Sequence, residues 1–159
     1  MMRICTATLA AFAIALTSTQ LFAQESPWEV KLLPAEESWL QSGAFRVNNA
    51  GDIVGDHSPG SNPFNTHATL WRGDAYFDLQ ESIGAPAGVT ATSAWALSES
   101  GLVGGMYRGV YAQGQFVQRA MLWDTVAGTW QDLHPSDPQI LHSVPIDINE
   151  VGQACGLIW

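Results

Sequence analysis

The strongest constraint on the fold of this chain is a glycine that recurs about every 50 residues. The spacings between Gly51, Gly101 and Gly152 are 50 and 51 residues. A second glycine follows each of them four places later. These second glycines are Gly55, Gly105 and Gly156. A fixed period of this length is typical of chains that repeat one supersecondary unit.

Each of these glycine pairs lies in a segment with the pattern of a β-hairpin. The three segments are 44–55, 94–105 and 145–156. Hydrophobic residues alternate with period two before the first glycine, as in a strand that buries one face. An Asn or Ser then opens a polar tetrad that ends in the glycine, the residue preferred where a turn needs positive φ. We expect the second glycine to let a neighbouring backbone approach closely.

A second motif recurs between the hairpins. The run His67–Trp71 (HATLW) matches Arg119–Trp123 (RAMLW), and each is followed by a further strand-like run that ends in Asp-Leu. One unit thus holds about four short strands in ~50 residues, the size of a propeller blade. The sequence therefore predicts an all-β fold of about three propeller-like repeats of four short antiparallel strands. Trp71 and Trp123 are expected in the core or between repeats.

The repeats define the expected domain boundaries. A β-repeat domain is predicted over 24–159, with a partial unit near 28–55 and fuller units near 67–105 and 119–156. This is fewer than three full units, whereas closed propellers usually have ~4–8 blades. We therefore expect an incomplete propeller, with an ordinary antiparallel sheet as the alternative. The sequence stops soon after the third hairpin, which predicts an open terminal strand, self-association through it, or truncation.

The alternation of these two motifs resembles the HAF-type extracellular repeat family. In that family a His-Ala-Phe-like strand alternates with a hairpin of the type Ala-Leu-Asn-x-x-Gly-x-Val-Val-Gly. The similar elements here are His67–Trp71 with the downstream Asp78-Leu79, and Ala94–Gly105. Departures from the family pattern occur at Thr69, Ser98 and Arg119. The resemblance implies an exported, β-propeller-like protein and brings no established activity. Kelch repeats are a weaker resemblance, based on one Gly-Gly doublet.

The first 23 residues have the three-part layout of a secretory signal peptide. A charged start with Arg3 leads into an apolar run over 4–16 and then into a more polar stretch ending at Ala23. We predict a signal-peptide helix and cleavage between Ala23 and Gln24. An uncleaved anchor is the alternative, but the apolar run is shorter than the ~20 residues that span a bilayer. Export predicts a secreted, extracellular or periplasmic protein with no membrane span after signal removal.

The charge balance narrows the possible partners. The chain carries 15 acidic and 6 basic residues, a net charge of −9. Nucleic acid is excluded as a partner, because its phosphates are bound through Lys and Arg. An unknown extracellular protein or glycan is the expected partner. The loop over 55–66 is the best place for a variable binding surface, although a plain surface loop without a ligand is the favoured interpretation.

The chain shows no recognisable motif for catalysis or metal binding. The four histidines lack the ligand spacing of zinc sites; they are His57, His67, His134 and His142. There is no Gly-x-Ser-x-Gly elbow, and Cys155, in an apolar run, is predicted to be buried rather than reactive. We therefore predict no catalytic residue, no metal and no cofactor.

These patterns together favour an exported, non-enzymatic β-repeat protein that serves as an extracellular interaction module of unknown ligand. One alternative is an enzyme on a propeller scaffold, such as a hydrolase or lyase acting on glycans. Another is a truncated fragment without a function of its own. A site that joins His57, His67 and at least two acids within hydrogen-bond reach would favour the enzyme.

Overall fold

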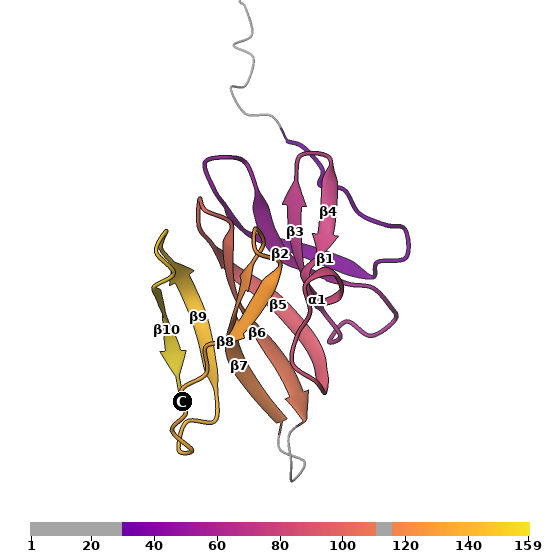
Figure 1. Cartoon of the computed structure of the whole chain (residues 1–159). Coiled ribbons are helices and arrows are strands. Elements are labelled where there is room, and N and C mark those ends of the chain that lie inside the picture. The colour runs from indigo at the N-terminus through magenta and orange to yellow at the C-terminus, as the bar shows by residue number, and fades with distance from the viewer. Residues whose placement is uncertain (1–29, 111–115) are drawn as a thin grey trace, which may run out of the picture. The chain divides into compact units, whose positions relative to one another are not determined.

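The computed structural model describes residues 30–110 and 116–159. The predicted signal peptide, with its cleavage site between Ala23 and Gln24, lies outside the described residues. The chain divides into two units, 1–31 and 32–159, and the second contains every element described below. These elements are antiparallel strands and one single-turn helix (Figure 1), so the predicted all-β class is confirmed. No helix among the described residues is long and apolar enough to cross a membrane.

Two four-stranded meanders account for most of the strands (Figure 1). In each meander every strand pairs antiparallel with the next one along the chain. Sheet A contains β1 (Gln41–Val47), β2 (Ile53–Ser58), β3 (His67–Arg72) and β4 (Ala75–Asp78). Helix α1 (Leu79–Ser82) follows it. Sheet B contains β5 (Val89–Leu97), β6 (Leu102–Val110), β7 (Phe116–Asp124) and β8 (Thr129–Asp132).

A two-stranded sheet, sheet C, follows the two meanders. It consists of β9 (Ser143–Ile148) and β10 (Ala154–Ile158). Its two strands correspond to the first two strands of sheets A and B, because the same glycine turn joins them. Within the described residues no further strand pairs with β10, and the sheets do not close into a propeller.

The sheets divide the chain at different places from the expected repeat units. The units expected near 67–105 and 119–156 each contain the end of one sheet and the start of the next. The reason is that β3 pairs with β2, and β7 with β6. A strand of the HATLW type therefore belongs with the glycine hairpin that precedes it. The partial unit expected near 28–55 supplies β1 and the start of β2 to sheet A.

Equivalent turns join the first two strands of the three sheets and contain Gly51, Gly101 and Gly152. The φ angles of these glycines are 83°, 87° and 80°, a region that glycine enters at little steric cost. In every turn the glycine N–H donates to the carbonyl three residues earlier. The side chain at that earlier position accepts from the N–H of the residue after the glycine. These acceptors are Asn48, Ser98 and Asn149, at 2.8, 3.0 and 2.9 Å.

The second glycine of each repeat lies where the first strand of the sheet approaches most closely. A Cβ atom at Gly55, Gly105 or Gly156 would lie 1.8, 2.3 or 2.1 Å from a carbonyl oxygen of that strand. The strand register shifts beside these contacts, as at a β-bulge. A side chain would separate the two strands, so glycine is required at this position.

Trp71 and Trp123 lie at the same place on the third strands of sheets A and B, and both are buried. Each stands opposite the residue two places after the turn glycine. Their indole N–H groups donate to the carbonyl oxygens of Pro34 and Gly84, at 2.8 and 3.0 Å. Each tryptophan therefore links its sheet by a hydrogen bond to the chain segment that precedes the first strand of that sheet.

Glutamates link the turns of successive sheets. The carboxylate of Glu99 accepts from the backbone N–H of Asn49 at 2.8 and 3.1 Å. In the same way Glu150 accepts from the backbone N–H groups of Glu99 and Ser100, at 2.7 and 2.8 Å. Hydrogen bonds to an ionised acceptor are stronger than neutral ones. A carboxylate from one turn thus holds the preceding turn in place.

Cys155 is exposed, so the prediction that it is buried was wrong. It lies on β10, which among the described strands has a neighbour on one side only. The equivalent residue of sheet A, Val54, is fully buried because β2 lies between β1 and β3 and belongs to the core. Both residues follow an apolar residue and precede the second glycine of the repeat, and the difference comes from what covers them.

Candidate functional site

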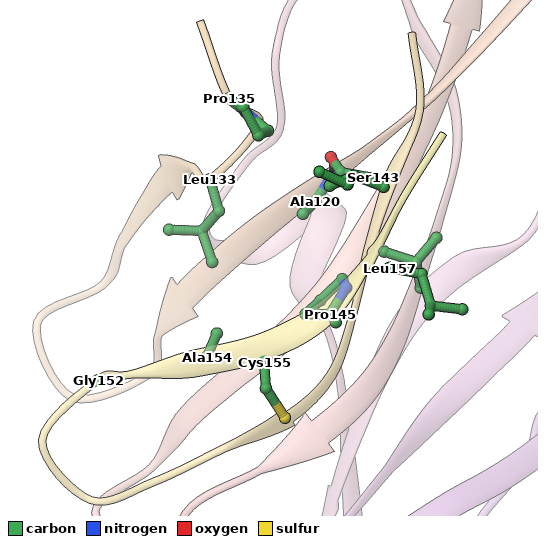
Figure 2. Close-up of a pocket in the computed structure, with 12 residues that line it drawn as sticks. Ala120, Leu133, Pro135, Ser143, Pro145, Gly152, Ala154, Cys155 and Leu157 are labelled. Atoms are coloured by element: carbon green, nitrogen blue, oxygen red, sulfur yellow. Dashed lines mark hydrogen bonds between the residues drawn. The ribbon is translucent and has the colours of Figure 1, made fainter. Parts of the chain in front are cut away.

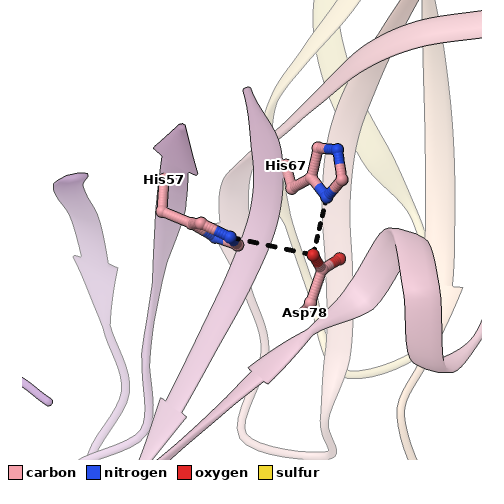
Figure 3. Close-up of side chains that lie close together, drawn as sticks. All are labelled: His57, His67 and Asp78. Atoms are coloured by element: carbon pink, nitrogen blue, oxygen red, sulfur yellow. Dashed lines mark hydrogen bonds and ion pairs between the residues drawn. The ribbon is translucent and has the colours of Figure 1, made fainter. Parts of the chain in front are cut away.

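Two imidazoles and a carboxylate converge on one face of sheet A (Figure 3). His57 on β2 lies directly opposite His67 on β3, and Asp78 at the end of β4 lies opposite Thr69. Residues two apart in a strand share a face, which brings these side chains together. The Oδ2 atom of Asp78 is 2.6 Å from Nδ1 of His67 and 3.8 Å from Nε2 of His57. We refer to His57, His67 and Asp78 as the histidine cluster.

The position of the proton on His57 follows from its hydrogen bonds. Nδ1 lies 2.7 Å from the Thr69 hydroxyl oxygen, and that hydroxyl donates to the carbonyl oxygen of His67 at 3.0 Å. Since the hydroxyl proton is already used, Nδ1 of His57 is the donor in the first contact. In the neutral ring the lone pair therefore lies on Nε2, which faces Asp78.

His67 is held from both sides of its ring. Nδ1 bonds to Asp78, and Nε2 lies 3.2 Å from the amide nitrogen of Gln80. The amide oxygen of Gln80 accepts from the Thr92 hydroxyl of sheet B at 2.9 Å. The Thr92 oxygen in turn accepts from the backbone N–H of Ala68 at 2.8 Å. The histidine cluster is thus part of a hydrogen-bond network that joins sheet A to sheet B.

The pKa values of the two imidazoles shift in opposite directions. Burial lowers the pKa of His57, and Asp78 offsets part of that effect. The hydrogen bond to Asp78 raises the pKa of His67. Charges outside the cluster that act on the rings are also acidic, with Glu36 acting on His57 and Glu81 on His67. The cluster therefore lies in a negative field, which favours a bound positive charge.

Aromatic side chains cover one side of His57. The Trp39 ring stacks on the imidazole with 4.0 Å between ring centroids, and Tyr76 packs edge-on against Trp39 at 4.6 Å. The Tyr76 hydroxyl bonds to Glu36. In the described part of the chain, Asp78 is the one carboxylate that contacts the imidazoles directly. The two acids expected of an enzyme cluster are therefore not assembled here.

Sheet B carries the same arrangement with different side chains. The residues in the positions of His57, His67 and Asp78 are Tyr107, Arg119 and Asp132, respectively, in the same strand register. The Tyr107 hydroxyl donates to Oδ2 of Asp132 at 2.9 Å. The aspartate thus belongs to the repeat, whereas the pair of imidazoles is particular to sheet A.

His134 takes the place of Gln80 in the sheet B network. Its Nε2 lies 3.1 Å from the carbonyl oxygen of Ile140 and therefore carries the proton, while Nδ1 lies 2.8 Å from the Ser143 hydroxyl. The Ser143 oxygen accepts from the backbone N–H of Ala120 at 2.9 Å and donates its own proton to Nδ1. Burial lowers the pKa of His134. Protonation of Nδ1 would also turn this atom from an acceptor into a donor, so that its proton and that of the Ser143 hydroxyl would face each other.

Mild acid is expected to destabilise the chain through His134, and His134→Gln should remove that part of the pH dependence. The folded-state pKa lies below the unfolded value of ~6.5, so the unfolded state binds more protons as the pH falls. The stability that depends on neutral His134 is complete above pH ~6.5 and is lost as the pH falls from the unfolded-state pKa to the lower folded-state pKa. Glutamine can accept from Ser143 as Gln80 does from Thr92. Urea midpoints of both proteins between about pH 5 and 8 test this, and parallel pH profiles would contradict it.

A second feature is a pocket of about 290 Å³ on sheet C (Figure 2). Most of its wall consists of β9, β10 and the turn at Gly152 between them, and Ala120 of β7, Leu133 and Pro135 complete it. Apolar side chains that line it include Leu133, Pro145, Ala154 and Leu157. The pocket therefore lies between sheet C and these residues of and after sheet B.

The predicted binding loop 55–66 is shorter than expected, because β2 continues to Ser58. This extension places His57 in a strand opposite His67. The cluster follows from the antiparallel pairing of these two segments, which no local sequence signal indicates. The remaining two histidines lie apart from it: His134 in the sheet B network and His142 stacked on Trp159 at 5.2 Å.

Comparisons of the chain with protein-family models, with curated proteins and with solved structures find no match.

Proposed function

We propose that this chain is an exported, non-enzymatic interaction module, built as an incomplete propeller-like array, whose sheet C binds an extended segment of a protein partner. The observation that carries the proposal is the open edge of β10. In the part of the chain that the structure describes, this strand pairs with β9 alone, and all five of its residues are exposed. The strands in the same position of sheets A and B, β2 and β6, are paired on both sides.

The backbone of β10 offers hydrogen-bonding groups to an added strand. Trp159 and His142 exchange both of their backbone hydrogen bonds, at 3.2 and 3.0 Å. Such pairs alternate along an antiparallel ladder, so the N–H and C=O of Ile158 point away from β9. An extended peptide can pair with groups of this kind by β-augmentation.

Apolar side chains at the end of β10 support the same interpretation. Leu157, Ile158 and Trp159 are 59%, 59% and 56% exposed. Exposed apolar edge strands tend to pair with other chains, and natural proteins usually protect them. A partner strand would cover this edge and its exposed apolar side chains.

The alternative of a glycan-directed hydrolase or lyase has less support. The histidine cluster contains one carboxylate in direct contact with its imidazoles. Its polar atoms also take part in a network that recurs in sheet B and joins the sheets. These features are explained by packing of the repeats without a reaction.

A synthetic peptide that copies His67–Leu79 tests the proposal. In sheet A this segment forms the two strands that follow β2, so it has the pattern that pairs with a strand in the position of β10. We expect saturable binding to the full chain, measured by fluorescence anisotropy of the labelled peptide. A scrambled peptide of the same composition is the control and should not bind.

A proline at position 158 provides the matched variant. Ile158→Pro removes the outward N–H and should weaken peptide binding about tenfold or more, because proline cannot donate to an added strand. Ile158→Val keeps the N–H and should bind as the unaltered chain does. If the unaltered chain does not take up the peptide, or the proline variant binds equally well, edge pairing is refuted.

A further inference from the structure

We propose that the histidine cluster is a binding site for a divalent transition-metal ion of the zinc class. The ligand atoms are Nε2 of His57, Nδ1 of His67 and Oδ2 of Asp78, which lie within 4.8 Å of one another (Figure 3). Imidazole nitrogen and carboxylate oxygen are ligands that zinc accepts in proteins, and three protein ligands leave a fourth position for water. This site is separate from the open edge of sheet C and does not depend on it.

The separations of the donor atoms are close to those that a four-coordinate ion requires. Metal–ligand bonds of about 2.0–2.2 Å place tetrahedral ligand atoms about 3.3 Å apart. The His57–Asp78 separation is 3.8 Å and the His67–Asp78 separation is 2.6 Å. The first must close and the second must open, each by less than 1 Å. Nε2 of His57 and Nδ1 of His67 lie within 4.8 Å of each other, so this pair must close by at most about 1.5 Å. The ion would take the place of the proton that now joins His67 to Asp78.

Outer hydrogen bonds already orient two of the three ligands. Nδ1 of His57 donates to Thr69, which leaves Nε2 as the free donor atom toward Asp78. The Oδ1 atom of Asp78 accepts from the backbone N–H of Glu81 at 3.0 Å, as the N-cap of α1, which leaves Oδ2 for the ion. Metal-binding histidines usually donate their other ring N–H to such an outer partner.

The third ligand, His67, has an outer partner that can adapt. When the ion occupies Nδ1, the ring proton lies on Nε2, toward the side-chain amide of Gln80. Rotation of that amide presents its oxygen to Nε2 and its nitrogen to the Thr92 hydroxyl oxygen. Both neighbours therefore keep a hydrogen bond, since an amide can donate or accept.

The comparison of sheets A and B independently favours a cation at this place. In sheet B the position of His67 is held by Arg119, which carries a permanent positive charge and lines a pocket of about 450 Å³ together with Asp132. In sheet A the same position holds an imidazole, while the acidic groups Glu36 and Glu81 act on the cluster. An ion bound beside Asp78 would supply in sheet A the positive charge that Arg119 supplies in sheet B.

The cluster is buried but can be reached from the surface. The side chains of His67 and Asp78 are 11% and 12% exposed, and that of His57 is 3% exposed. The three residues come from neighbouring strands of one sheet, so the backbone register fixes which side chains meet. A site on strands is more precisely held than a site on loops.

Zinc titration of the chelator-treated full chain by calorimetry tests the proposal. We expect one ion per chain. Asp78→Asn keeps an N-cap side chain and His57→Gln keeps a polar group, and each should weaken zinc binding about tenfold or more. Thr69→Val leaves all three ligands in place and should weaken binding about tenfold, as the loss of an outer partner does. The control is His142→Gln, which removes a histidine outside the cluster and should bind zinc unchanged.

The result that overturns the proposal is an unaltered chain that binds no zinc, or zinc binding that His142→Gln abolishes and Asp78→Asn does not. Measurements on the unaltered chain avoid any effect of substitutions on folding. Zinc should raise its melting temperature, because an ion that binds only the folded state stabilises it. X-ray absorption at the zinc edge should show two imidazole ligands. An unchanged melting temperature or fewer than two imidazoles would also overturn the proposal.

Discussion

Replacement of Trp123 by alanine is expected to lower the free energy of unfolding by about 3–5 kcal/mol. The side chain is 0% exposed and belongs to the core cluster of the sheets. Its indole N–H donates to the carbonyl oxygen of Gly84 at 3.0 Å. The substitution leaves a cavity and removes the partner of that carbonyl, and both effects are destabilising. Urea denaturation followed by circular dichroism measures the change.

The matched control for this prediction is Trp159→Ala. Trp159 is 56% exposed and stacks on His142, so its removal opens no cavity in the core. We expect a change within about 0.5 kcal/mol, as for most surface substitutions. Equal losses for the two tryptophans would show that Trp123 does not have the role that its burial indicates.

Gly105→Ala is expected to destabilise the chain by about 1–3 kcal/mol or more, since added atoms force strain into a packed site. A Cβ atom there would lie 2.3 Å from the carbonyl oxygen of Ser93 and 2.6 Å from the Trp123 ring. The first neighbour is backbone and the second is a fully buried ring, so neither can move aside cheaply. The strand β5 must separate from β6 to admit the methyl group. Urea midpoints give the size of the effect, and amide exchange should show faster opening of these two strands.

Gly60→Ala is the control for the glycine prediction. Its Cβ would meet no atom within 4 Å, and its φ is not in the left-handed region. We expect no loss of stability and even a gain of about 0.4–1 kcal/mol, because alanine restricts the unfolded chain. A Gly105→Ala protein as stable as Gly60→Ala would contradict the close strand approach described above.

The features that the sequence revealed most clearly are local ones. The Asn or Ser that opens each polar tetrad and the glycine that closes it act within one turn, and the three turns have the same hydrogen bonds. Such a turn depends on a few neighbouring residues and their allowed φ values. The all-β class followed from the same local signals, repeated every 50 residues or so.

The grouping of strands into sheets was harder to predict. The hairpin at Gly101 and the preceding run His67–Trp71 are both strand-like, and nothing local states whether they pair. In the structure that run pairs with the earlier hairpin. Strand pairing is a long-range choice, decided by register and by which faces the sheets bury together.

The histidine cluster could not be predicted from the sequence for the same reason. His57, His67 and Asp78 follow one another at intervals of ten and eleven residues, which is not the spacing of a zinc motif. They meet because β2 continues to Ser58 and pairs in a register that sets His57 against His67. A shift of the register by one residue would send one of the two imidazoles to the other face.

The sequence by itself determined the repeat, the turn positions, the need for glycine in the turns and the all-β class, because turn chemistry and strand periodicity act over a few residues. Only the tertiary structure decided which strands share a sheet, which side chains are buried and which polar groups meet. Val54 and Cys155 show the difference, since they hold equivalent positions and one is buried while the other is exposed. Burial depends on the neighbouring strands and sheets that cover a residue, and these come from distant parts of the chain.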